Sequence, residues 1–235
     1  MRMAFAWIAS LFLLQSLPDS DTFISEFRKT LRSDDELLQN YAYTEKVTRT
    51  EIDRSGKPKS SDIHVYQVFP DHGQLYRRLI SKNGVPPSPD QEMMKPVAPR
   101  DDSKIRDELF EIYDIQLERR EPIEHSSAIV LSFRPRPGFK PQSKLASFLT
   151  HVSGRAWVNE PDHQLMRVEA EVVDPVSYGW ILGSLEEGTR LIAERQKVEN
   201  GAWLPVKLDI QKSQRVLLKG VQMHEVHEYS EHRKF

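Results

Sequence analysis

The chain contains no cysteine. This absence excludes disulfides and cysteine-based metal sites, and it excludes membrane attachment through a lipid on a lipobox cysteine. With 235 residues the chain is long enough to bury a sizeable apolar core, so it can fold without disulfides. We therefore expect one disulfide-free domain.

The chain also lacks an excess of either charge. It has 33 lysines and arginines against 35 aspartates and glutamates, which gives a net charge of −2 at pH 7. Binding of duplex nucleic acid usually requires a basic stripe or patch. We therefore do not expect nucleic acid as a partner.

Catalytic and cofactor-binding motifs are missing too. The sequence has no Gly-x-Ser-x-Gly elbow, no Gly-x-Gly-x-x-Gly fingerprint and no phosphate-binding loop, and its ten glycines fall singly. A hydroxyl nucleophile needs a positioned base, and no motif identifies one. The sequence therefore predicts a protein that is not an enzyme and needs no cofactor. A hydrolase is the least favoured function.

The one long apolar run lies at the N-terminus, over residues 4–14, and is short for a bilayer span. Arg2 precedes it, and polar residues with a Pro18-Asp19 break follow. This layout predicts a secretory signal peptide over residues 1–19, cut after Ser16 or Ser20, with an uncleaved anchor as the alternative. We expect residues 20–235 to be periplasmic, without a membrane span.

Alternation of apolar and polar residues predicts strands in the last third of the chain. Residues 154–172 form a short strand, a Pro-Asp turn and a longer strand. The longer strand places one apolar set inward, opposite Arg167, Glu169 and Glu171: Met166, Val168, Ala170 and Val172. A third strand repeats the pattern with Leu204, Val206, Leu208 and Ile210 inward. Such a sheet needs a cover on its apolar face.

Helical spacing and turn signals organise the rest of the chain. A helix capped by Ser20 or Asp21 carries Phe23, Phe27 and Leu31 on one face, and three strands follow over residues 41–81. A short helix begins at residue 102 or 103, and a strand hairpin spans residues 112–133. Residues 143–152 predict a helix that covers the sheet, before strands over 188–198, 202–213 and 217–230.

Two segments have more than one interpretation. Residues 84–100 hold five prolines together with Met93 and Met94, which is typical of a surface connection or of a mobile flap over an apolar ligand. Arg134, Arg136 and Lys140 form a basic segment that is either a solvated loop or a contact for an anionic headgroup or acidic partner.

Over residues 154–169 and again over 200–205, the sequence resembles the outer-membrane lipoprotein-sorting proteins, the LolA/LolB-like superfamily. The order of elements agrees with that family over roughly residues 20–235. The resemblance implies an α+β fold, in which a curved antiparallel sheet forms an unclosed β-barrel covered by short helices. It also implies periplasmic carriage of lipid-modified proteins or other lipids, without chemistry on them. No cavity arginine or acyl-chain contact can be placed by motif, so the cargo does not transfer with the fold.

Seven apolar residues are candidates for lining a ligand cleft: Phe148, Met166, Val168, Trp180, Leu204, Val206 and Leu208. The same residue types also build a solid core, so the residues alone leave both interpretations open. The resemblance favours the cleft, with lipid or lipoprotein acyl chains as its ligand. The alternative is a non-enzymatic envelope interaction or sensor module on the same fold, with a protein in the cleft.

The histidines near the C-terminus do not predict a metal site. His224 and His227 are three residues apart, so on a strand they point to opposite faces and cannot chelate one ion together. We interpret them, together with His232, as a polar outer face and a solvated tail.

Overall fold

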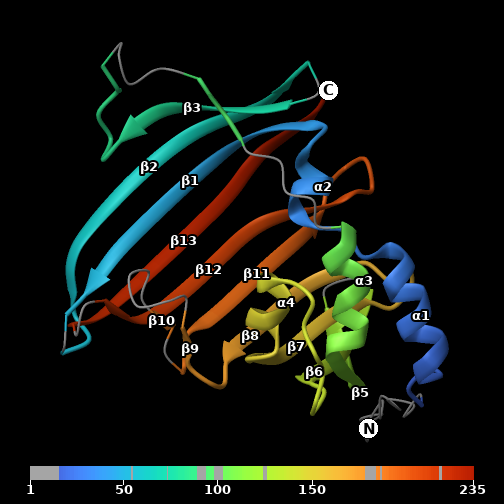
Figure 1. Cartoon of the computed structure of the whole chain (residues 1–235). Coiled ribbons are helices and arrows are strands. Elements are labelled where there is room, and N and C mark those ends of the chain that lie inside the picture. The colour runs from blue at the N-terminus through green and yellow to red at the C-terminus, as the bar shows by residue number, and fades with distance from the viewer. Residues whose placement is uncertain are drawn as a thin grey trace, which may run out of the picture.

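A single curved antiparallel sheet organises the computed structural model (Figure 1). The structure describes residues 16–53, 55–72, 74–88, 94–97, 103–123, 126–177, 184–185, 187–216 and 219–235. Eleven strands follow one another across the sheet in the order β4-β3-β2-β1-β13-β12-β11-β8-β7-β6-β5, while β10 pairs with β12 and β9 pairs with β10. The strands are β1 (Tyr41–Ile52), β2 (Pro58–Asp71), β3 (Gln74–Lys82), β4 (Lys95–Pro96), β5 (Tyr113–Ile123), β6 (Ser126–Pro135), β7 (Val152–Asn159), β8 (Leu165–Val172), β9 (Val176–Ser177), β10 (Ser184–Leu185), β11 (Arg190–Lys197), β12 (Trp203–Val216) and β13 (Lys219–Lys234).

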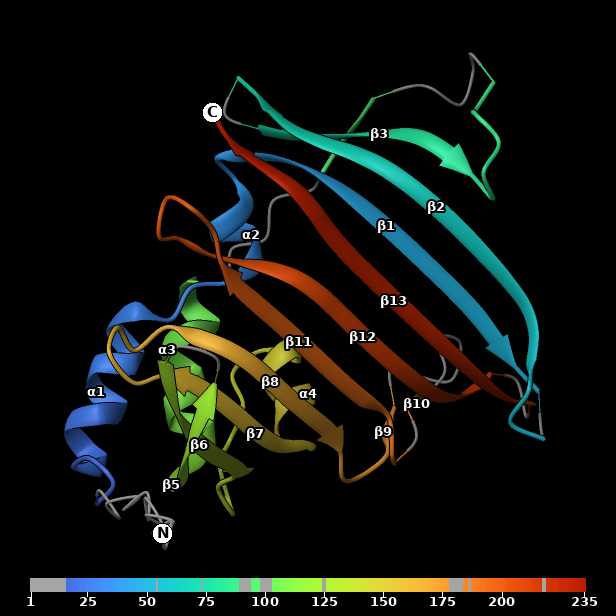
Figure 2. The same ribbon diagram turned by 180° about the vertical axis from the view of Figure 1, so that it is seen from behind.

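The sheet is not closed, because β4 and β5 stand at opposite ends of the strand order and do not pair in the described part of the chain. The first and last long strands are neighbours, with Tyr41 of β1 opposite Lys234 of β13. The view from behind shows the long strands β1, β2, β12 and β13 side by side and the helices on the far side of the sheet (Figure 2). The expected fold class, an α+β unclosed antiparallel barrel covered by short helices, is confirmed.

In the described part of the chain, four helices cover the inner face: α1 (Ser20–Thr30), α2 (Asp34–Leu38), α3 (Ser103–Ile112) and α4 (Lys144–Leu149). Phe23 and Phe27 of α1 are buried against Ile129 and Leu131 of β6. These phenylalanines are four residues apart and share one helix face, as their spacing predicted. The expected cap is wrong by one residue or two, because Asp19, rather than Ser20 or Asp21, accepts the hydrogen bond from Thr22 N at 2.9 Å.

Cross-strand pairing interrupts two of the predicted alternations. Val158 pairs with Leu165 and Trp157 pairs with Arg167, so Met166 is an extra, bulged residue. Met166 packs against Trp157 on the outer face, and its predicted place beside Val168 is wrong.

A second bulge lies in β12, between Lys207 and Pro205. Leu208 is opposite Ala193 and Leu204 is opposite Gln196, so the two leucines lie on different faces of the sheet. The predicted single face for Leu204, Val206, Leu208 and Ile210 is therefore wrong at Leu204.

Gly154 of β7 has no side chain and so leaves room on the inner face for the ring of Phe133, its partner in the neighbouring strand β6. A Cβ at residue 154 would lie 2.0 Å from the Glu169 carbonyl oxygen and 2.8 Å from the Phe133 ring. Any side chain would therefore push against backbone that the β7–β8 ladder holds in place.

We expect Gly154→Ala to lower the free energy of unfolding by about 1–3 kcal/mol, because this overlap cannot be relieved by a side-chain rotation alone. Urea denaturation would measure the change, with Ser153→Ala one residue away as the control. An unchanged urea midpoint for Gly154→Ala would show that the strands separate easily at this point.

Candidate functional site

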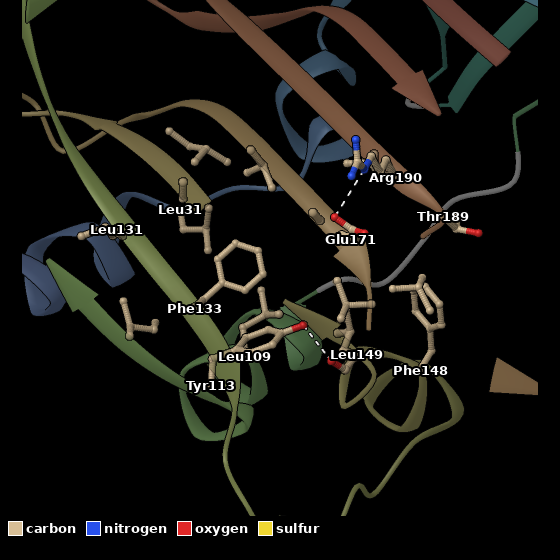
Figure 3. Close-up of a pocket in the computed structure, with 18 of the residues that line it drawn as sticks. Leu31, Leu109, Tyr113, Leu131, Phe133, Phe148, Leu149, Glu171, Thr189 and Arg190 are labelled. Carbon is tan, nitrogen blue, oxygen red and sulfur yellow. Dashed lines mark hydrogen bonds and ion pairs between the residues drawn. The ribbon is translucent and has the colours of Figure 1, made fainter. Parts of the chain in front are cut away.

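An apolar cleft of ≈ 460 Å³ lies between the helices and the inner face of the sheet (Figure 3). Residues of three helices and of strands β5–β8, β11 and β12 surround it: Phe27, Leu31, Leu109, Phe110, Tyr113, Ile115, Leu131, Phe133, Phe148, Leu149, Val152, Ala156, Leu165, Val168, Ala170, Glu171, Val172, Thr189, Arg190, Leu191, Ile210 and Lys212. The volume lies within the usual range of ligand pockets, which is roughly 300–1,000 Å³.

The cover of the cleft comes from α1, α3 and α4. Phe27 of α1 meets Phe110 of α3 edge to face, with ring centroids 5.9 Å apart. Tyr113, at the start of β5, donates a hydrogen bond from its hydroxyl to the Leu149 carbonyl at 2.9 Å, which fixes the end of α4 (Figure 3). Burial raises the pKa of the Tyr113 hydroxyl, so this donor keeps its proton. The cover is thus held at defined points around an unfilled interior.

The floor of the cleft comes from the alternating strands. Val168 of β8 stands opposite Ala156 of β7 and Ala193 of β11. Both cross-strand neighbours are alanines, whose short side chains leave space between the sheet and the helices. Small residues beside Val168 therefore explain why this part of the inner face is hollow rather than filled.

Three polar residues border one side of the cleft. Glu171, Thr189 and Arg190 lie together there, away from Leu31 and Leu131 (Figure 3). Arg190 Nε is 3.3 Å from Glu171 Oε2, so these two charges compensate each other. Lys212 also lines the cleft, and its Nζ is 3.3 Å from Glu225 Oε2 outside it. Glu171 and Arg190 follow and precede the inward-facing Ala170 and Leu191, so their side chains point to the outer face and the wall of the cleft itself is apolar.

A second pocket of ≈ 320 Å³ adjoins the first and shares Leu165, Val168 and Leu191 with it. Helix α2 borders this pocket through Asp34 and Asp35. Arg195 of β11, whose side chain is only 9% exposed, holds α2 in place, with its Nη2 2.7 Å from Asp34 Oδ1. This ion pair ties the helical cover to the sheet beside the cleft.

The predicted cleft residues are only partly brought together. Phe148 and Val168 line the apolar cleft, and Met166 borders the second pocket instead. Leu204, Val206 and Leu208 do not line either pocket. Trp180 lies outside the described residues, as does Met93 of the proline-rich segment.

Residues outside the predicted set supply much of the wall. Phe133 and Leu131 come from β6, and Tyr113 begins β5, so their contribution depends on how the β5–β6 hairpin curls under the helices. The helical spacing of Phe27 and Leu31 was a usable signal for one covering face.

The histidines and the basic segment have structural partners. His227 is 2.7 Å from Glu45 Oε1 through Nδ1 and 2.8 Å from Glu225 Oε1 through Nε2. His224 is paired with Asp209 at 2.8 Å on the outer face of β13, so the predicted outer face is right for His224 and wrong for His227, because the two residues are three apart on one strand. Arg136 donates from Nε to the Tyr113 carbonyl at 2.9 Å, so it braces the start of β5.

No protein-family model and no curated protein matches the sequence. Solved structures do resemble the fold. A LolA superfamily protein from Nitrosomonas europaea is 13% identical, with a TM-score of 0.39 over 93% of this chain and 94% of that one. A DUF1329 family protein from Desulfovibrio piger is 14% identical, with a TM-score of 0.39 over 91% and 92%. An outer membrane lipoprotein-sorting domain from Vibrio parahaemolyticus is 10% identical, with a TM-score of 0.40 over 91% of each chain.

Proteins of the superfamily that the sequence resembles are therefore among the similar structures, as predicted. At these identities the likeness concerns the arrangement of elements alone. Among the described residues, no helix is both long and apolar enough to cross a membrane.

Proposed function

We propose that the protein is a non-enzymatic periplasmic carrier that binds acyl chains of a lipid or lipoprotein in the apolar cleft. The observation that carries this proposal is an unfilled interior with an apolar wall, where a soluble domain usually has a close-packed core. An acyl chain that enters the cleft gains about 0.8 kcal/mol for each buried methylene group. Among the described residues of the wall, no nucleophile is paired with a base. Their apolar side chains are suited to binding a ligand rather than to reacting with it.

Release of the cargo requires the cover to move. The ion pair between Arg195 and Asp34, together with the hydrogen bond from Tyr113 to Leu149, closes the cover in the structure. Transfer of the acyl chain to an apolar site on a second protein would compensate for the free energy lost when the chain leaves the cleft.

Native mass spectrometry of protein purified from its own host under mild conditions tests the proposal directly. We expect an added mass that corresponds to a bound lipid and that disappears after extraction with detergent. A protein that is always empty, but that co-purifies tightly with an envelope protein, would support the interaction module instead.

Export is part of the proposal, and the cap of α1 favours one cleavage point. Asp19 caps α1, so cleavage after Ser20 would remove a cap worth about 1 kcal/mol, whereas cleavage after Ser16 keeps it. We expect the intact mass of periplasmic protein to correspond to a chain that begins at Leu17. A periplasmic protein that retains Met1 would contradict cleavage.

A further inference from the structure

The inner face of the sheet changes from apolar to charged along its rows of cross-strand partners. One row runs from β6 to β2 through seven neighbouring pairs, with Phe133, Gly154, Ala170, Leu191 and Ile210 followed by Glu225, Arg49 and Asp62. A parallel row begins with Leu131, Ala156, Val168, Ala193 and Leu208 and continues with His227, Val47 and His64. Residues directly opposite each other share a face. Both rows therefore reach their first charged or titratable residue at the same place, between β12 and β13, and Val47 is the one apolar residue beyond it.

The helical cover stops near the same place. Helices α1, α3 and α4 lie over the β5–β8 part of the sheet, whereas no described helix lies in front of the middle of β13 or β1 (Figure 1). The charged part of the inner face thus continues the cleft beyond its cover.

We call this part the charged floor: Glu45, Arg49, Arg77, Lys212, Glu225 and His227. Glu225 alone has three cationic partners, with Lys212 Nζ and Arg49 Nε each at 3.3 Å and His227 Nε2 at 2.8 Å. Glu45 is shared between His227, at 2.7 Å, and Arg77, at 2.9 Å. Two carboxylates therefore face three permanent cations and a histidine.

The charges at the border of the floor do not alter this balance. Asp62 and Lys82 lie on the same face and are one acid and one base, and Glu51 is paired with Lys59 at 2.8 Å. Burial alone would lower the pKa of His227, but its hydrogen bonds to Glu45 and Glu225 and their charges outweigh burial and raise it. Among its own residues the floor therefore has a positive excess, which grows when His227 is protonated; beyond this border, the nearest carboxylates belong to α2, where Asp34 is paired with Arg195 at 2.7 Å.

Cations and carboxylates lie at different depths in the floor. The side chains of Glu45 and Glu225 are only 11% and 10% exposed, whereas those of Arg49, Arg77 and Lys212 are 54%, 33% and 30% exposed. A group that approaches from the cleft therefore meets the cationic ends first. Lysine and arginine in such a setting favour phosphate or carboxylate oxygens.

Lys212 connects the two parts, because it lines the apolar cleft and also pairs with Glu225. We propose that the acyl ligand has an anionic headgroup, which lies on the charged floor next to Lys212 and Arg49 while its chain fills the cleft. This inference rests on the proposed acyl-binding function and specifies the class of lipid.

Competition between two single-chain phospholipids tests the inference. Lysophosphatidylglycerol and lysophosphatidylcholine with the same acyl chain would each displace a fluorescent fatty acyl probe from the wild-type protein. We expect the anionic lipid to bind about tenfold more tightly, since one charged hydrogen bond is worth roughly that ratio. Glycerol phosphate without a chain should not displace the probe, because it gains nothing from the cleft.

Lys212→Gln and Arg49→Gln should each reduce the preference for the anionic lipid to about threefold or less, with little effect on lysophosphatidylcholine. Lys207→Gln is the matched control, because Lys207 is on the same strand but points to the outer face, where it pairs with Asp209 at 3.3 Å. It should keep the wild-type preference.

The outcomes separate the two proposals. Equal binding of the two lipids by the wild type, or a preference that survives both glutamine variants, would overturn the charged floor as the headgroup site while leaving the acyl carrier intact. If neither lipid displaces the probe, or the probe itself never binds, the carrier proposal fails and this inference fails with it.

Discussion

Val168→Trp should fold like the wild type and lose the binding of a fluorescent fatty acyl probe. Val168 lies in the cleft wall between Ala156 and Ala193, and the adjoining space of ≈ 460 Å³ can take an indole ring. In a solid core the same substitution would overpack and cost about 1–3 kcal/mol. Thermal unfolding and a probe titration on the same preparation would measure both quantities. We expect a small change in melting temperature and a loss of affinity of at least tenfold.

Glu169→Trp is the matched control for this experiment. It introduces the same ring one residue along β8 on the outer face, where Glu169 pairs with Arg167 and is 42% exposed. Probe affinity should stay at the wild-type value. Strong destabilisation of Val168→Trp, combined with a wild type that never binds the probe, would mean that the interior is solid and that the carrier proposal is wrong.

The sequence predicted the elements better than their faces. Alternation located β8 and β12 correctly, and helical spacing located the buried side of α1, because both patterns depend on local geometry alone. The bulges at Met166 and Val206 depend instead on which residues of a neighbouring strand pair with them. A one-residue insertion changes the face of the residues that follow it. The sequence of a single strand does not show where such a bulge lies.

The contacts of the charged floor were even harder to predict from the sequence of single strands. His227 contacts Glu45 across a separation of 182 residues, because β1 and β13 are neighbours in the sheet. Periodicity within β13 predicted correctly that His224 and His227 diverge, and it therefore argued against a shared metal site. It did not predict that His227 would bridge two carboxylates on the inner face. That contact depends on the pairing of β1 with β13. The alternation of residues within each strand does not predict which strands pair.

The cleft and the floor also differ in how they hold the sheet together. In the cleft, apolar burial is incomplete, so this region contributes less stability than a filled core of the same area would. On the floor, ion pairs connect β1, β3, β12 and β13 beside the apolar cluster of Leu38, Tyr43 and Val68. The protein thus combines an apolar cleft beneath its helices with a network of ion pairs on the strands that these helices leave uncovered.

Glu225→Ala should lower the free energy of unfolding by about 1–3 kcal/mol at pH 6, because it removes a carboxylate that is only 10% exposed and leaves His227, which is 15% exposed, without one of its two acidic partners, whereas the more exposed Arg49 and Lys212 are stabilised by water. Urea denaturation would measure this loss. Glu228→Ala on the same strand is the control. Its side chain is 50% exposed on the outer face, pairs with Lys46 at 2.8 Å and should contribute about 1 kcal/mol or less.

The pH dependence of this difference provides a further test. Burial would raise the pKa of Glu225, but hydrogen bonds from His227 and Arg49 and the charge of Lys212 lower it from 4.5 to about 2. A carboxylate with a lowered pKa stabilises the folded state fully above its unfolded value, and the contribution is lost as the pH falls from 4.5 towards 2. His227 has a raised pKa, so its contribution is complete below 6.5 and is lost as the pH rises through its folded value.

The gap in stability between the wild type and Glu225→Ala should therefore be widest between pH 4.5 and 6.5, where Glu225 is ionised and His227 is protonated. It should narrow towards pH 2, as the wild-type carboxylate takes up its proton. It should narrow more gently above pH 7, where Lys212 and Arg49 remain charged after His227 has lost its proton. A gap that stays constant from pH 3 to pH 8 would show that the ion pairs of Glu225 do not stabilise the fold, and that the backbone ladder and packing hold β1 against β13 without them.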